Sequence, residues 1–149
     1  MQKCTLALGC FWKPEETFKS KAGIIETEVG YAGGLNERVT YEEVCNGNTG
    51  HAEVVRLTFD ENIISFKKII DLFFKMHDPT QKDMQYPDVG TQYRSEIFYE
   101  TDQQKQEASK ILNEFNKKFD GKIQTNISKI KNYCKAEEYH QKYIEKNKQ

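Results

Sequence analysis

Residues 2–16 read QKCTLALGCFWKPEE, and this stretch sets the start of the fold. The apolar run 2–8 predicts a buried strand, and Pro14 followed by two glutamates indicates the start of a helix. Cys10 lies at this junction, where helix amides lack partners and favour a thiolate. The aromatic residues Phe11 and Trp12 supply an apolar wall beside the sulfur. The alternative is that Cys10 is a small buried packing residue.

Beyond residue 16 the chain alternates between helix and strand patterns, with no repeat or linker. Ser65 precedes apolar residues at helical spacing, and Thr101 with Gln104 predicts a capping box. The predicted strands are 2–8, 24–31, 51–59, 94–99 and 125–130, and the predicted helices are 14–21, 66–76, 101–119 and 136–148. This alternation predicts a single two-layer α/β or α+β domain over residues 1–149.

Composition excludes several classes of protein. With 22 basic and 23 acidic residues the net charge is −1, so we expect no nucleic-acid partner. No apolar run approaches the roughly 20 residues of a membrane span. The 4 cysteines have irregular spacing and do not resemble a disulfide scaffold. We therefore expect a cytoplasmic protein that does not associate with membranes.

Four other residues are candidate companions of Cys10. Glu53 follows a glycine-rich turn at the start of a predicted strand, and Tyr41 closes another glycine-containing loop. Asp88 and Tyr93 end a long polar loop, a kind of segment that is often functional in a small domain. The alternatives are a surface glutamate, a turn aspartate and half-buried tyrosines.

A metal site is not favoured by the sequence. Cys45 with His51, and Cys134 with His140, both show a Cys-x5-His spacing. Structural zinc sites prefer shorter spacings within each ligand pair. We expect no metal.

Five segments, taken in order, resemble the peptide methionine sulfoxide reductase A family. They are GCFW at 9–12, YEEVCNGNTGHAE at 41–53, HDPTQ at 77–81, DVGTQYRS at 88–95 and AEEYHQKY at 136–143. The resemblance implies an α+β fold with a two-layer ferredoxin-like core, a mixed sheet with helices packed on it. It also implies reduction of the S epimer of methionine sulfoxide, free or in proteins, without a cofactor. The resemblance also implies a role for each matching residue. Cys10 is the nucleophile, Glu53 is the acid, and Tyr41 and Tyr93 donate hydroxyl hydrogen bonds to the sulfoxide oxygen. Asp88 supports these polar residues, and Phe11 and Trp12 contact the S-methyl group.

Regeneration of Cys10 from its sulfenic acid is open. Many family members carry a glycine-rich tail with resolving cysteines, and this sequence has none before Gln149. Cys4 would lie about 20 Å away along the strand, beyond disulfide reach, and Cys45 is expected to be a buried packing residue. Cys134 precedes the last predicted helix, near where that tail would start, and we predict it as the resolving thiol. Otherwise thioredoxin, glutaredoxin or another external thiol reduces the sulfenic acid directly. We expect the protein to be a monomer.

Two other functions remain as alternatives. One is a different cysteine enzyme, such as a thiol hydrolase in which a histidine activates Cys10. The other is a non-catalytic binder of oxidised proteins, which the presence of Cys10, Glu53 and Tyr93 disfavours.

Overall fold

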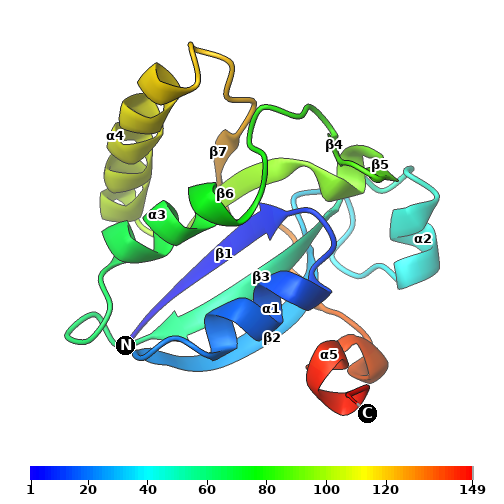
Figure 1. The fold of residues 1–149 in the computed structure, drawn as a ribbon. Coiled ribbons are helices and arrows are strands. Elements are labelled where there is room, and N and C mark those ends of the chain that lie inside the picture. The colour runs from blue at the N-terminus through cyan, green and yellow to red at the C-terminus, as the bar shows by residue number, and fades with distance from the viewer. Residues whose placement is uncertain (149) are drawn as a thin grey trace.

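A computed structural model describes residues 1–148, and its main feature is a six-stranded mixed sheet. The sheet strands are β1 (Gln2–Leu8), β2 (Ile24–Ala32), β3 (Ala52–Phe59), β6 (Ser95–Tyr99), β7 (Asn126–Lys129) and β8 (Cys134–Lys135), and β4 (Met84–Gln85) pairs separately with β5 (Asp88–Val89). The helices are α1 (Trp12–Lys19), α2 (Tyr41–Cys45), α3 (Phe66–Met76), α4 (Asp102–Lys118) and α5 (Tyr143–Lys146), as Figure 1 shows. Short 3₁₀ turns cover Thr91–Tyr93 and Glu138–His140.

The strand order is β7-β6-β1-β3-β2-β8, and every neighbouring pair is antiparallel except β6 with β7. Within it, β1-α1-β2 and β3-α3-β6 form two strand–helix–strand units, and α1 and α3 cover the same face of the sheet (Figure 1). This confirms the predicted α+β fold with a mixed sheet and helices packed on it.

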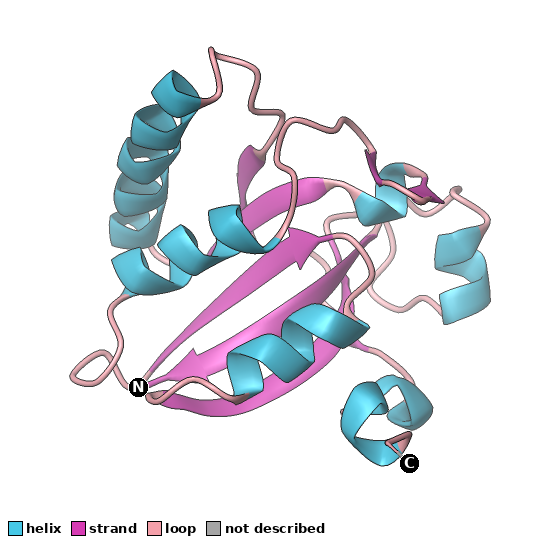
Figure 2. Ribbon diagram, viewed as in Figure 1, coloured by secondary structure: helices cyan, strands magenta, loops and turns pink. Residues whose placement is uncertain are grey.

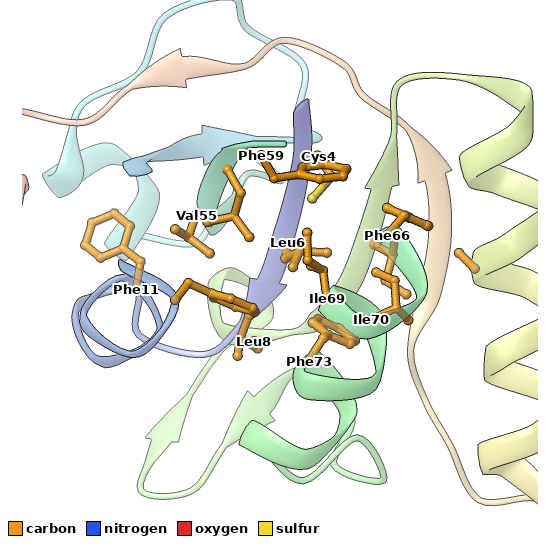
Figure 3. Close-up of a cluster of buried hydrophobic side chains, with 14 of the residues drawn as sticks. Cys4, Leu6, Leu8, Phe11, Val55, Phe59, Phe66, Ile69, Ile70 and Phe73 are labelled. Atoms are coloured by element: carbon orange, nitrogen blue, oxygen red, sulfur yellow. The ribbon is translucent and has the colours of Figure 1, made fainter. Parts of the chain in front are cut away.

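The core lies between the sheet and its helices. Cys4, Leu6 and Leu8 alternate along β1 and point toward α3, which presents Ile69 and Phe73 (Figure 3). This alternation is the period-2 pattern of a strand that buries one face. Truncating a fully buried leucine such as Leu6 to alanine costs about 2–5 kcal/mol, so this core fixes β1 and hence the residues that follow it.

The long helices match their sequence signals. Ser65 caps α3, because its hydroxyl accepts a hydrogen bond of 3.0 Å from the Lys68 amide. The Thr101 hydroxyl caps α4 in the same way. The predicted capping box is only half formed, since the Gln104 side chain accepts instead from the Glu100 amide at 2.9 Å. No helix within residues 1–148 is long and apolar enough to cross a lipid bilayer.

The predicted helix over 136–148 is wrong. Within 136–148 the structure has a 3₁₀ turn at Glu138–His140 and one helical turn, α5, at Tyr143–Lys146 (Figure 2). The chain here binds the edge of the sheet: the Ala136 amide donates to the Val29 carbonyl at 3.0 Å, and the Gln141 side chain bonds both the amide and the carbonyl of Val29. These tertiary bonds override the local helix pattern.

A one-turn helix that the sequence analysis did not predict, α2, follows the loop after β2. Thr40 and Glu43 form its capping box, each side chain accepting from the other's backbone amide. This cap sets where α2 begins, and therefore where Tyr41 lies.

Candidate active site

Antiparallel pairing brings four segments together at the same end of the sheet, where their strands start or stop. Leu8, the last residue of β1, pairs with Ser95 at the start of β6, and Glu53 near the start of β3 pairs with Tyr31 near the end of β2. Consequently Cys10 after β1, Tyr93 before β6, Glu53 in β3 and α2 after β2 converge, although they are distant in sequence.

Cys10 is half-buried immediately before α1. Gly9 makes the turn possible with a φ of +96°, and a β-carbon there would come within 3.0 Å of Gln85. Burial raises the pKa of Cys10 to about 11, although a hydrogen bond from the Trp12 backbone lowers it. The expected helix-terminus effect therefore has the predicted direction, but desolvation outweighs it. The raised pKa favours the thiol form of Cys10 at neutral pH, opposite to the thiolate that the helix terminus alone would favour.

Glu53 is 1% exposed and lies beside the backbone of Phe11. Its Oε1 accepts a hydrogen bond from the Phe11 amide at 3.2 Å. Its Oε2 is buried and has no partner within the described part of the chain. Burial raises the pKa of Glu53 to about 8, with a further contribution from the charge of Asp88. Glu53 thus carries a proton at neutral pH, which a buried carboxyl with one unpaired oxygen can donate.

Tyr41 and Tyr93 lie within electrostatic range of Glu53. Burial raises the pKa of Tyr93, and the charges of Glu53, Asp88 and Cys10 act in the same direction. Burial also raises the pKa of Tyr41, assisted by a hydrogen bond to Cys45 and by the charge of Glu53. Both hydroxyls therefore stay protonated and can donate hydrogen bonds. The structure brings the predicted polar residues into one cluster with Cys10.

The two predicted apolar residues have different environments. Phe11 is 1% exposed, with its ring against Tyr31 at 5.8 Å and His140 at 5.2 Å between centroids. Trp12 is half-buried, and its indole N–H donates to Nδ1 of His140 at 3.0 Å. Of the two, Trp12 is therefore the side chain with exposed surface.

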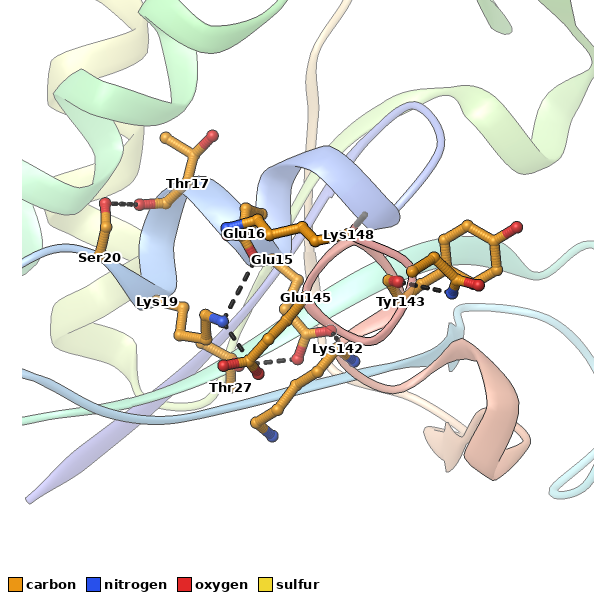
Figure 4. A network of polar contacts seen from close by, with 11 residues as sticks. Glu15, Glu16, Thr17, Lys19, Ser20, Thr27, Lys142, Tyr143, Glu145 and Lys148 are labelled. Atoms are coloured by element: carbon orange, nitrogen blue, oxygen red, sulfur yellow. Dashed lines mark hydrogen bonds and ion pairs between the residues drawn. The ribbon is translucent and has the colours of Figure 1, made fainter.

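Two aromatic residues that the sequence analysis gave no role complete this wall. Tyr143 stacks on Trp12 with 3.8 Å between centroids and an angle of 8°, and His140 contacts Tyr41 at 4.5 Å. The buried Glu15 accepts from the Lys142 amide at 2.7 Å and from Thr27, which holds Tyr143 in place (Figure 4). The AEEYHQKY segment carried the signal, but sequence alone does not reveal that it packs on Trp12.

The other cysteines lie in three different settings. Cys4 is fully buried in β1, and Cys45 is exposed at the end of α2 rather than buried as expected. The charge of Cys45 acts on Cys10, which places the two sulfurs within electrostatic range of one another. Cys134 is half-buried in β8, where its thiol donates to the Val39 carbonyl at 3.8 Å. The strand order places β3 and β2 between β1 and β8, so the structure does not bring Cys134 to Cys10.

Among the described residues, His77 is the histidine that lines the cavity beside Cys10, and it is not placed to act as a base. That cavity, of about 430 Å³, is lined by Cys10, Lys13, His77 and Asp88 among others. His77 bonds the Phe73 carbonyl at 2.7 Å and the Ser95 hydroxyl at 2.8 Å, and burial lowers its pKa to about 4. Over residues 1–148, no three His, Cys, Asp or Glu side chains are grouped so as to hold a metal ion.

Comparisons with known proteins agree with this geometry. A sequence model of the peptide methionine sulfoxide reductase family matches residues 2–149. The peptide methionine sulfoxide reductase MsrA of Pelagibacter ubique is 56% identical over 146 residues, covering 98% of this chain and 99% of that protein. The reduced form of Mxr1 from Saccharomyces cerevisiae superposes with a TM-score of 0.94 at 41% identity, covering 98% of this chain and 85% of Mxr1. Mxr1 in complex with Trx2 gives a TM-score of 0.68 at 30% identity, with coverage of 95% and 84%.

Proposed function

The chain belongs to the peptide methionine sulfoxide reductase family and is a thiol-dependent oxidoreductase that reduces methionine sulfoxide, and on this premise we propose that Cys10 attacks the sulfoxide sulfur while Glu53 protonates its oxygen. The observation that carries the assignment is the unpaired, buried Oε2 of Glu53, together with a pKa raised to about 8. A carboxyl that is protonated at neutral pH is the acid that this reaction needs.

The reaction oxidises Cys10 and reduces the sulfoxide by two electrons. Protonation of the oxygen by Glu53 makes the sulfoxide sulfur electrophilic, and a bond forms between it and the Cys10 sulfur. The thiol proton of Cys10 passes to the Glu53 carboxylate, so the acid is restored. The hydroxyl then transfers to the Cys10 sulfur as the substrate S–O bond and the new S–S bond break, which gives a sulfenic acid and releases methionine. Because Cys10 rests as a thiol, this proton transfer to Glu53 is part of the step.

Tyr41 and Tyr93 orient the sulfoxide oxygen by donating hydrogen bonds, and Asp88 supports them. Their raised pKa values keep both hydroxyls in the donating form at physiological pH. A hydroxyl donor adds orientation without adding a charge that would compete with Glu53.

The S-methyl group lies on the open face of Trp12, with Phe11 as the buried base beneath it. The sulfoxide oxygen meets the hydroxyl donors while the S-methyl group meets aromatic carbon, and the rings of Trp12 and Tyr41 both pack against His140, at 5.7 and 4.5 Å between centroids. Such a pocket is chiral, and it accepts the S epimer of methionine sulfoxide, free or within proteins. Epimer selectivity therefore depends on Trp12 and Tyr41 together.

An external thiol reduces the sulfenic acid while the sheet is intact. Thioredoxin is the expected reductant, since the related Mxr1 forms a complex with Trx2, and glutaredoxin or another thiol can replace it. Resolution by Cys134, which the sequence analysis predicted, would require β8 to separate from β2. The protein acts as a monomeric single domain, without a cofactor. A cytoplasmic location fits its 4 free cysteines.

The experiment that tests the assignment is a single turnover with the S epimer of methionine sulfoxide and no reductant. Wild-type protein yields one methionine per Cys10, Cys10→Ser yields none, and Glu53→Gln yields it slowly. Full activity of Cys10→Ser would refute the proposal.

A further inference from the structure

The segment from Cys134 to Tyr143 binds along the outer side of β2 and reaches the end of the sheet that holds the active site. Its strand β8 pairs Cys134 with Tyr31, and the Gln141 side chain holds the Val29 backbone through bonds of 2.9 and 2.8 Å. The segment is therefore fixed to β2, and it carries the charged side chain of Glu137 into the space between β2 and α2.

Both oxygens of Glu137 are used, one on each side. Its Oε1 accepts from the Tyr31 hydroxyl at 2.8 Å, and its Oε2 accepts from the Tyr41 backbone amide at 2.9 Å. Although burial raises the pKa of Glu137, these bonds outweigh it and hold the pKa below its usual value. Glu137 is therefore a carboxylate at neutral pH, and it accepts from two fixed donors.

The Tyr41 amide is the first N–H of α2, which has no partner within the helix. Because α2 is only 5 residues long, it depends on its caps rather than on its own hydrogen bonds. Thr40 satisfies the Glu43 amide at 3.2 Å, and Glu137 satisfies that of Tyr41. Together these two contacts set the position of the Tyr41 backbone and limit where its hydroxyl can reach.

We propose that Glu137 is a positioning residue for sulfoxide reduction, whose carboxylate fixes the start of α2 so that the Tyr41 hydroxyl meets the sulfoxide oxygen. This inference rests on the proposed function, in which Tyr41 donates to that oxygen. Tyr31 extends the same contact to the other wall, since its ring packs on Phe11 at 5.8 Å between centroids. Glu137 thus links the donor side of the site to its aromatic side.

Glu137→Gln is the direct test, because an amide has the same shape but can accept from only one of the two donors. We expect the single-turnover rate at saturating sulfoxide to fall about tenfold, as for the loss of one hydrogen bond to a charged acceptor. The KM should change little, because Trp12 is not moved. Glu138→Gln is the matched control: this neighbouring side chain is 82% exposed, and its variant should react at the wild-type rate.

The decisive comparison uses a Tyr41→Phe background. If Glu137 acts through the Tyr41 hydroxyl, Glu137→Gln changes the rate less than twofold once that hydroxyl is absent. An equal loss in both backgrounds would show a merely structural role and overturn the proposal. A wild-type rate for Tyr41→Phe alone would also overturn it, whereas methionine production by Cys10→Ser would instead refute the proposed function.

Thr40→Val provides a second variant in case Glu137→Gln folds poorly. Thr40 is exposed, and its substitution weakens the same helix start by removing the cap on Glu43. It should lower the rate severalfold with Tyr41 present and leave it unchanged with phenylalanine at that position. A loss that does not depend on the Tyr41 hydroxyl would contradict the proposal here as well.

Discussion

The backbone N–H of Phe11 donates to Oε1 of Glu53 at 3.2 Å. This bond ties the residue after the nucleophile to the acid, so that the turn after β1 and the start of β3 keep a fixed separation. It also leaves Oε2 as the oxygen of Glu53 that is free to carry the proton. The geometry of one amide bond thus determines which carboxyl oxygen faces the chemistry.

Glu53→Gln should slow the sulfoxide step about 100-fold or more at pH 7, the usual contribution of a positioned acid. The amide retains the Phe11 bond but cannot protonate the substrate. Methionine formed in a single turnover, followed by rapid quench, measures this. Glu26→Gln, an exposed site on β2, is the control and should react like wild type. Near-wild-type turnover of Glu53→Gln would remove Glu53 from the acid role.

The same carboxyl makes the rate depend on pH. Because the pKa of Glu53 is about 8, the fraction that carries the proton falls as the pH rises through that value. The single-turnover rate of the wild type should therefore decline above about pH 8. That decline should be absent in Glu53→Gln, whose slow rate no longer depends on this group. An identical alkaline limb in both proteins would assign it to another residue.

Burial of Glu53 should also destabilise the protein at high pH. Its folded pKa of about 8 lies above the ordinary value of 4.5, so its contribution to stability is full below 4.5 and is lost as the pH rises through 8. Relative to Glu53→Gln, the wild type should lose free energy of unfolding across this interval. Urea titrations of both proteins at pH 5 and pH 9 measure the difference. Parallel pH dependences would show that the buried carboxyl is not the cause.

The sequence predicted most of the fold because local patterns determine its long elements. The apolar stripe after Ser65 and the strand before Cys10 are read from periodicity alone, and both are confirmed. The predicted helix over 136–148 failed because Gln141 and Ala136 bind the backbone of Val29, which is over a hundred residues away. Contacts of this kind leave no periodic trace in the sequence.

The active site shows the same limit. The order of motifs identified Cys10, Glu53 and the tyrosines, and the structure places them in one cluster. The helix start that favours a Cys10 thiolate is visible in the sequence, whereas the desolvation that raises its pKa depends on what covers the sulfur. The sequence also did not predict that the rings of His140 and Tyr143 pack against Trp12.

Tyr143→Ala should weaken substrate binding by exposing the rear face of Trp12. The lost stacking corresponds to a rise in KM of about 2- to 10-fold, with little change in the rate at saturation. Trp12 is the only tryptophan, so its emission should shift to longer wavelength in the same variant. Tyr143→Phe keeps the ring and should match the wild type in both measurements. An unchanged KM for Tyr143→Ala would show that stacking does not shape the pocket.

Oxidation by one equivalent of substrate, without reductant, should leave a sulfenic acid on Cys10. Three strand spacings separate β1 from β8, about 14 Å, whereas disulfides need α-carbons within about 7 Å. Intact mass should therefore increase by one oxygen. A loss of two hydrogens with a peptide joining Cys10 to Cys134 would instead show that β8 leaves β2 and that Cys134 is the resolving thiol. Cys134→Ser provides the matched control for that linkage.

The most direct test measures the methionine that the reduced protein forms from the S epimer and, separately, from the R epimer of methionine sulfoxide, with no other thiol present. We expect one equivalent from the S epimer, little from the R epimer, and none from Cys10→Ser. Methionine formation by Cys10→Ser, or none by the wild type, would contradict the proposed function.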